Sequence, residues 1–129
     1  MSEVERLSSG LPQLSRLMGD ASGLRAVVQT ARRGVGMSVV QAEHDSAVLV
    51  ERCVQLVTEL GATLAALQLR LERDGAYTGR VVATVGNIRQ LLAACERSLG
   101  DSESLEFASV IVRRASPAYI RDLSFIYHA

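Results

Sequence analysis

The chain has 129 residues, of which 48% are apolar, 22% charged and only 4% aromatic. Its 14 basic and 14 acidic residues give a net charge of zero, and every basic residue is an arginine. The length fits one domain over residues 1–129, and the apolar fraction is too high for a disordered chain. Dedicated nucleic-acid binders need a basic surplus, so the charge balance argues against nucleic acid as a partner.

The amino-terminal segment, residues 1–37, predicts short helices. Apolar residues recur there at helical spacing, at Val4, Leu7, Leu11, Leu14 and Met18. Gly10 and Pro12 interrupt this pattern, so we expect a break and a new helix that starts at Pro12. Asp20 or Ser22 is predicted to cap a further short helix before residue 37.

Residues 38–100 predict a long antiparallel helical hairpin. The first arm runs from Ser38 to Arg73 and carries an apolar stripe at Leu49, Cys53, Leu56, Leu60, Leu64, Leu67 and Leu71. Asp74-Gly75 is a stop signal, and Thr78 is a candidate cap for the second arm. The second arm, from Arg80 to Leu99, has a heptad seam at Val81, Val85, Ile88, Leu92, Cys95 and Leu99.

The two predicted arms differ in length. At 1.5 Å per residue the first arm is about 54 Å long and the second about 30 Å. The first arm therefore overhangs the second over residues 38–52, where several valines need a cover. We expect that cover to come from the amino-terminal segment, from the carboxy-terminal segment or from a second copy of the chain.

Residues 101–129 predict two further helices. Ser102 is a candidate cap for a helix that runs to Arg114, although Val110–Val112 also fits a short strand. Ser116 and Pro117 are typical of a helix start and predict a separate last helix. Together the segments predict an all-α fold, in which a long helical hairpin packs with shorter terminal helices in a four- to six-helix bundle.

The sequence holds few residues suited to catalysis or metal binding. His44 and His128 are the only histidines, and no zinc, nucleophile-elbow or phosphate-loop motif is present. Cys53 and Cys95 lie on apolar stripes, so we expect buried free thiols. We therefore predict no catalytic residue, no cofactor and no metal ion. An alternative is an anionic-ligand site, and possibly a small enzyme, built from Arg52, Arg70, Arg80 and Arg89 in the bundle core.

The distribution of charged and apolar residues predicts interaction surfaces. The long helix is acidic and the second arm basic, a pattern that helps to select partners and register, although mixed-charge surfaces are common. The wide apolar face of the long helix favours a homodimer, and three of the five aromatic residues lie near the carboxy terminus. The predicted interface residues are Val39, Val40, Val50, Val54, Val57, Tyr119, Phe125 and Tyr127.

These features favour a non-enzymatic interaction protein, a dimeric adaptor, chaperone-like factor or regulator. The alternatives are the arginine-based ligand site and a structural subunit of a phage or secretion system. The amino terminus has no signal-peptide pattern, and no stretch is apolar enough to span a membrane, so we expect a cytoplasmic protein. The use of arginine without lysine suggests a bacterial source with a genome rich in G and C.

Overall fold

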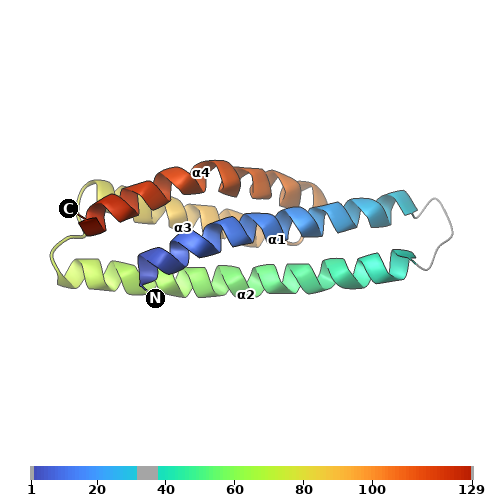
Figure 1. Ribbon diagram of the computed structural model, residues 1–129, viewed down its shortest axis with the longest axis horizontal. Helices are drawn as coiled ribbons and strands as arrows, with labels where there is room; N and C mark the ends of the chain where they lie inside the picture. Colours follow the sequence, from blue (N-terminus) through green and yellow to red (C-terminus); the bar gives the residue numbers. More distant parts are fainter. Residues whose placement is uncertain (1, 32–37, 129) are drawn as a thin grey trace.

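A computed structural model describes residues 2–31 and 38–128 of the chain. It contains the helices α1 (Glu3–Ala31), α2 (Ser38–Arg73), α3 (Arg80–Ser98) and α4 (Ser102–His128), and these two ranges hold no strand (Figure 1). The predicted all-α bundle is confirmed, with four helices in the described ranges. The terminal helices, of 29 and 27 residues, are longer than α3, which has 19.

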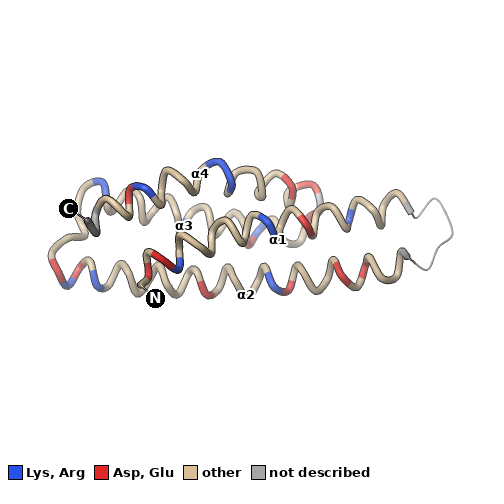
Figure 2. The backbone as a smooth tube through the Cα atoms, in the orientation of Figure 1, with Lys and Arg blue, Asp and Glu red and all other residues tan. Residues whose placement is uncertain are grey.

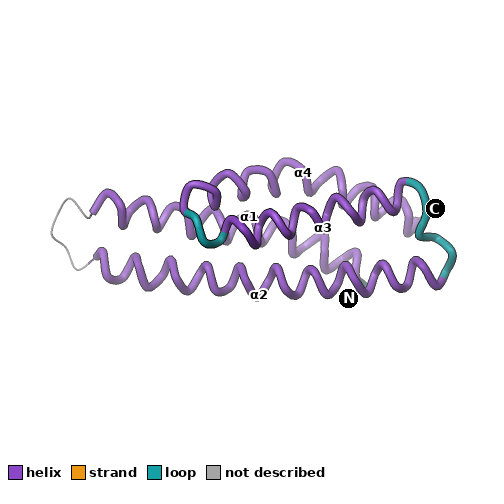
Figure 3. The backbone as a smooth tube through the Cα atoms, turned by 180° about the vertical axis from the view of Figure 1, so that it is seen from behind, coloured by secondary structure: helices purple, strands orange, loops and turns teal. Residues whose placement is uncertain are grey.

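The helices form an elongated bundle in which consecutive helices run in opposite directions (Figures 1 and 3). Each helix packs on two neighbours: α1 contacts α2 and α4, and α3 contacts the same two helices. Within the described residues, the diagonal pairs α1–α3 and α2–α4 do not pack on each other. Because α2 and α4 are diagonal, their outward faces point to opposite sides of the bundle.

The predicted hairpin boundaries are confirmed, and local chemistry explains the turn. Gly75 has a φ of +69°, which glycine adopts without strain. The Gly75 amide donates to the Glu72 carbonyl, and the Ala76 amide donates to the Leu71 carbonyl at 2.8 Å. This is a Schellman motif, which satisfies carbonyls at the end of α2. The prediction that Thr78 caps α3 is wrong, because Gly79 holds that position without a side-chain cap.

The predicted breaks in the amino-terminal segment are wrong. A single helix, α1, passes through Gly10, Pro12, Asp20 and Ser22. A proline inside a helix costs about 3 kcal/mol. Each fully buried leucine contributes about 1.5–3 kcal/mol, and the α1 stripe contains several residues with no exposed surface, namely Leu7, Leu11, Leu14 and Met18. Burial of one continuous stripe outweighs the local penalty.

The carboxy-terminal segment also forms one helix instead of two. Pro117 lies inside α4, and Val110–Val112 is helical, so both the second helix start and the alternative strand are wrong. Pro117 is on the exposed side of α4, as Pro12 is on α1, so water can reach the carbonyl that lacks a donor. The cap of α4 is Asp101, whose carboxylate accepts hydrogen bonds from the Glu103 amide and the Ser104 hydroxyl.

The core contains residues of all four helices. The predicted stripes of α2 and α3 face inward, and Cys53 and Cys95 are buried free thiols as expected. Two sites of close packing interrupt the leucine-rich interior. At Gly10, a Cβ atom would clash with the side chain of Leu60, so α1 and α2 approach closely there. Between α1 and α4, the buried Ser15 and Ser109 hydrogen-bond to each other's backbone carbonyl.

The α1–α2 pair extends beyond α3 and α4 at one end of the bundle (Figure 1). We call this projection, residues 26–31 of α1 and 38–48 of α2, the tip. The guanidinium of Arg25 on α1 donates to the carbonyl of Leu99, the residue that ends α3, at 3.3 Å. In the tip Val28 and Ala42 are each 7% exposed. Of the three covers considered for the overhang, the amino-terminal segment supplies the observed one.

Charged residues of both signs are spread over the bundle (Figure 2). Arg70 of α2 pairs with Glu3 of α1, with 3.1 Å between Nη1 and Oε2. None of the helices in residues 2–31 and 38–128 has the length and apolar content needed to cross a bilayer.

Candidate functional site

The outward face of α2 carries exposed apolar side chains. Val40 and Val54, two predicted interface residues, are 72% and 48% exposed. Val39 and Val50 are half-buried, and Val50 packs against the core. Val57 is only 7% exposed and belongs to the core of its own chain, so it is not available to a partner. The broad valine-rich face therefore divides between core and surface.

The exposed residues of α2 form a regular pattern, which we call the α2 outer stripe. Its members are spaced by 3, 4, 4, 3 and 4 residues, are all exposed, and are Val40, Glu43, Ala47, Glu51, Val54 and Thr58. This spacing places them on one face of the helix. Thr58 Oγ1 donates to the Val54 carbonyl at 2.9 Å, so the hydroxyl is used within the helix.

Acidic residues dominate this part of α2. Residues 38–59 carry the carboxylates of Glu43, Asp45, Glu51 and Glu59 against the single arginine Arg52. Three of these acidic residues, Glu43, Asp45 and Glu51, belong to the half of α2 nearer the tip, where Figure 2 shows acidic positions along the helix. The α2 outer stripe therefore combines exposed apolar side chains with a net negative charge.

The carboxy-terminal aromatic residues have different environments. Tyr119 packs against the core, whereas Phe125 is 73% exposed on the outward face of α4. The side chain of Tyr127 lies outside the described part of the structure. Of the predicted interface aromatics with a described side chain, Tyr119 therefore contributes to the core of its own chain, whereas Phe125 is on the surface.

A second outward pattern, the α4 outer stripe, was missed by sequence reasoning. Its members are spaced by 4, 3, 4, 3 and 4 residues and are Phe107, Ile111, Arg114, Ala118, Arg121 and Phe125. Phe107 is 69% exposed. The signal was present, because α4 carries apolar residues on two opposite faces, but Phe125 is the one member of this stripe among the predicted interface residues.

The α4 outer stripe is basic. Between residues 107 and 121 the helix has three arginines, at positions 113, 114 and 121, and no acidic residue. Beside the stripe lies an apolar recess of about 240 Å³ between α3 and α4. Phe107 and Ile111 line one wall, and Leu91 and Ala94 line the other. The stripe and recess together offer aromatic, aliphatic and guanidinium groups, the combination typical of protein interfaces.

The four arginines predicted as an anion site do not converge. Arg70 pairs with Glu3, and Arg89 Nη2 donates to the Gln68 side chain. Arg52 and Arg80 are exposed at positions far apart on α2 and α3. Each of these arginines is therefore either exposed to solvent or bound to a side chain of another helix.

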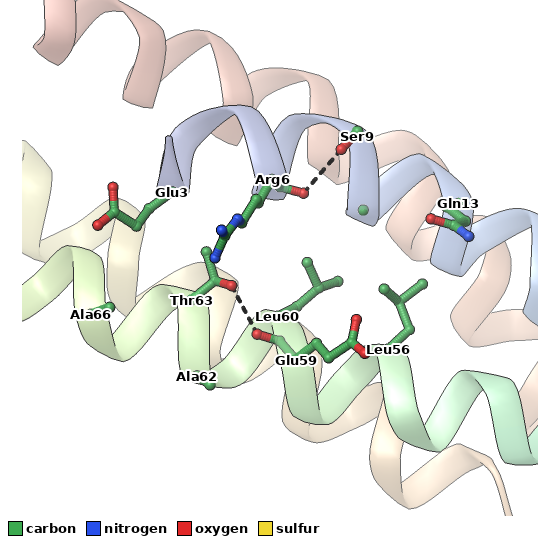
Figure 4. A pocket seen from close by; sticks show the side chains of 11 residues that line it. Glu3, Arg6, Ser9, Gln13, Leu56, Glu59, Leu60, Ala62, Thr63 and Ala66 are labelled. Carbon is green, nitrogen blue, oxygen red and sulfur yellow. Dashed lines mark hydrogen bonds between the residues drawn. The ribbon is translucent and has the colours of Figure 1, made fainter. Parts of the chain in front are cut away.

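A groove of about 580 Å³ lies between α1 and the middle of α2 (Figure 4). Arg6 and Glu59 border it, and Leu56 and Leu60 point into it from α2. The Ser9 hydroxyl donates to the Arg6 carbonyl, and the Thr63 hydroxyl donates to the Glu59 carbonyl, so both are used within their own helices. Ligand sites usually present several convergent polar groups on an apolar lining. This groove presents the cation Arg6 and the anions Glu3 and Glu59, and Glu3 is already paired with Arg70.

The buried thiols are poorly suited to nucleophilic chemistry. Burial raises the pKa of Cys53 from 9.0 to about 11. Burial, together with the nearby Cys53, raises the pKa of Cys95 from 9.0 to about 12. His44 is exposed on α2. Within residues 2–31 and 38–128, no group of three His, Cys, Asp or Glu side chains could hold a metal ion.

Comparison of the chain with protein-family models, with curated proteins and with solved structures finds no match.

Proposed function

We propose that this chain is a non-enzymatic interaction protein, an adaptor, chaperone-like factor or regulator, that works by self-association and helix-to-helix contact. The observation that carries the proposal is the pair of exposed, helically spaced stripes on α2 and α4, with Val40 and Phe125 more than two-thirds exposed. Large exposed apolar side chains grouped on one face are typical of interaction sites. We place it in the cytoplasm, where free thiols such as Cys53 and Cys95 are usual.

The test is the solution mass of the full chain. Sedimentation velocity over a range of micromolar concentrations should give an average mass that rises above the 13.9 kDa of one chain. A substitution that places a charge on a stripe, such as Val54→Asp, should lower that mass without changing the helical content measured by circular dichroism. A chain that remains monomeric at the highest concentration, with Val54→Asp indistinguishable from the wild type, would overturn the proposal.

A further inference from the structure

The geometry points to a specific self-association: the α4 outer stripe of one copy docks, antiparallel, on the α2 outer stripe of the next copy. This inference rests on the proposed function and adds the two faces, their register and the symmetry of the assembly. It differs from the two-fold homodimer that the valine-rich pattern of α2 alone favours.

The two stripes match in length. Val40 to Thr58 and Phe107 to Phe125 cover equal numbers of residues, about 27 Å of helix at 1.5 Å per residue. Both stripes are built from steps of three and four residues, a spacing that lets side chains of two helices interdigitate along a seam.

Their charges are complementary in one orientation. When the helices run antiparallel with Ala47 opposite Ala118, Glu51 lies opposite Arg114 and Val54 opposite Ile111. The same register places Val40 opposite Phe125 at one end. Glu43 lies opposite Asp122, whose carboxylate accepts a hydrogen bond from Thr84 of α3, and one position from the stripe residue Arg121. The two alanines allow close approach at the centre, with the Glu51–Arg114 pair on one side.

The main ionic pair has no competing partner within the chain. Among the described residues, neither Glu51 nor Arg114 takes part in an ion pair. An α2–α2 pairing through this stripe lacks this match, because the stripe carries Glu43 and Glu51 and no basic residue, so like charges would face each other. Complementary potentials set both orientation and choice of partner.

The position of the stripes decides the symmetry. Since α2 and α4 are diagonal in the bundle, the two stripes face opposite sides, and one neighbour cannot occupy both. Each copy therefore offers its α2 outer stripe to one neighbour and its α4 outer stripe to another. Contacts of this heterologous kind repeat in one direction and build filaments or rings instead of a closed two-fold dimer.

The first experiment blocks one face at a time. Val54→Asp places a charge on the α2 outer stripe, and Phe107→Asp places one on the α4 outer stripe. Both positions are exposed, so both variants should fold. Circular dichroism and thermal melting check this. Each variant alone should sediment as a monomer. An equimolar mixture should give a one-to-one complex that does not grow further, because only one open pair of faces remains.

The matched control is Leu69→Asp, which charges an exposed residue of α2 beyond the stripe. This variant should assemble as the wild type does. A two-fold dimer through α2 gives a different pattern, in which Phe107→Asp still self-associates and mixing rescues nothing. That pattern would overturn the inference.

The second experiment reverses the central charges. Glu51→Arg and Arg114→Glu should each weaken self-association by more than about tenfold, since each places like charges opposite each other. The double variant should regain most of the wild-type affinity. If the wild type self-associates and the double variant is as weak as the single ones, the register is wrong and the proposed function stands. If the wild type is a monomer, both fail.

Discussion

Ser15 of α1 and Ser109 of α4 exchange hydrogen bonds across the helix pair. The Ser15 hydroxyl donates to the Ser109 carbonyl at 2.9 Å, and the Ser109 hydroxyl donates to the Ser15 carbonyl at 2.8 Å. Both residues are buried, and a Cβ at the adjacent Gly19 would lie 3.2 Å from Ser109 Oγ. The reciprocal pair marks a close approach of α1 and α4.

The serine pair predicts a dependence on side-chain size. Ser109→Ala should lower the free energy of unfolding by about 1 kcal/mol, because one buried hydrogen bond is lost. Ser109→Leu should lower the free energy of unfolding by about 1–3 kcal/mol more, because the larger side chain must separate the helices. Urea unfolding measures both. A leucine variant as stable as the alanine variant would contradict the close approach.

The contact between Gly10 and Leu60 predicts an unusual sign for a glycine substitution. In an open helix position, Gly→Ala stabilises by about 1 kcal/mol through helix propensity. At Gly10 the added methyl would clash with Leu60, which is buried, so Gly10→Ala should destabilise the bundle. Thermal melting of the variant gives the sign.

Gly61 provides the matched control for Gly10. It lies inside α2, and an added Cβ there meets no atom within 4 Å. Gly61→Ala should therefore stabilise the protein. In a Leu60→Ala background the clash is absent, so Gly10→Ala should change sign and become stabilising. Destabilisation that persists in this background would mean that Leu60 is not its cause.

The buried thiols predict a loss of stability at alkaline pH. An exposed thiol of the unfolded chain loses its proton near 9.0, whereas Cys53 in the folded chain keeps its proton up to about 11. Between these values the unfolded state binds fewer protons, so the free energy of unfolding falls as pH rises. Below pH 9 these thiols cause no such dependence.

The measurement is urea unfolding at a series of pH values, for the wild type and for Cys53→Ala/Cys95→Ala. The double variant should show a smaller decline above pH 9, although it is less stable throughout. Contributions from all other groups are common to the two proteins and cancel in the comparison. Equal slopes would show that the thiols do not cause the decline.

Asp101 predicts a pH effect at the acidic end. Hydrogen bonds from the Ser104 hydroxyl and the Glu103 amide lower the pKa of this carboxyl below 3.8. Its contribution to stability is therefore present above that value and is lost as pH falls through the lowered pKa. Asp101→Ala should lower the melting temperature at neutral pH, and Asp101→Asn should lower it less, since asparagine is also a good cap. The difference between wild type and Asp101→Ala should shrink in acid.

The elements predicted well from sequence are those fixed by local patterns. The stripes of α2 and α3 repeat with the period of a helix, and Gly75 supplies the positive φ that ends α2. Their boundaries follow from interactions within a few residues of each helix end. Sequence reasoning could also place Cys53 and Cys95 inside, because both fall on leucine-rich stripes.

The elements predicted poorly depend on tertiary packing. Pro12 and Pro117 are helix breakers by local rules, and only the burial of neighbouring stripes on other helices makes α1 and α4 continuous. The division of valines on α2 between core and surface has the same origin. Val57 and Val54 are three residues apart, and the position of α3 decides that one is covered and the other exposed.

The tip should have a lower local stability than the four-helix part of the bundle. Beyond Arg25 only two helices continue, and small side chains such as Val28 and Ala42 bury less area than the leucines of the four-helix part. Amide hydrogens of residues 26–31 and 39–48 should therefore exchange with solvent by local unfolding, well before those near Leu60. Part of the α2 outer stripe lies on this segment. A neighbour seated there would slow exchange at the tip, so assembly and local folding are thermodynamically coupled.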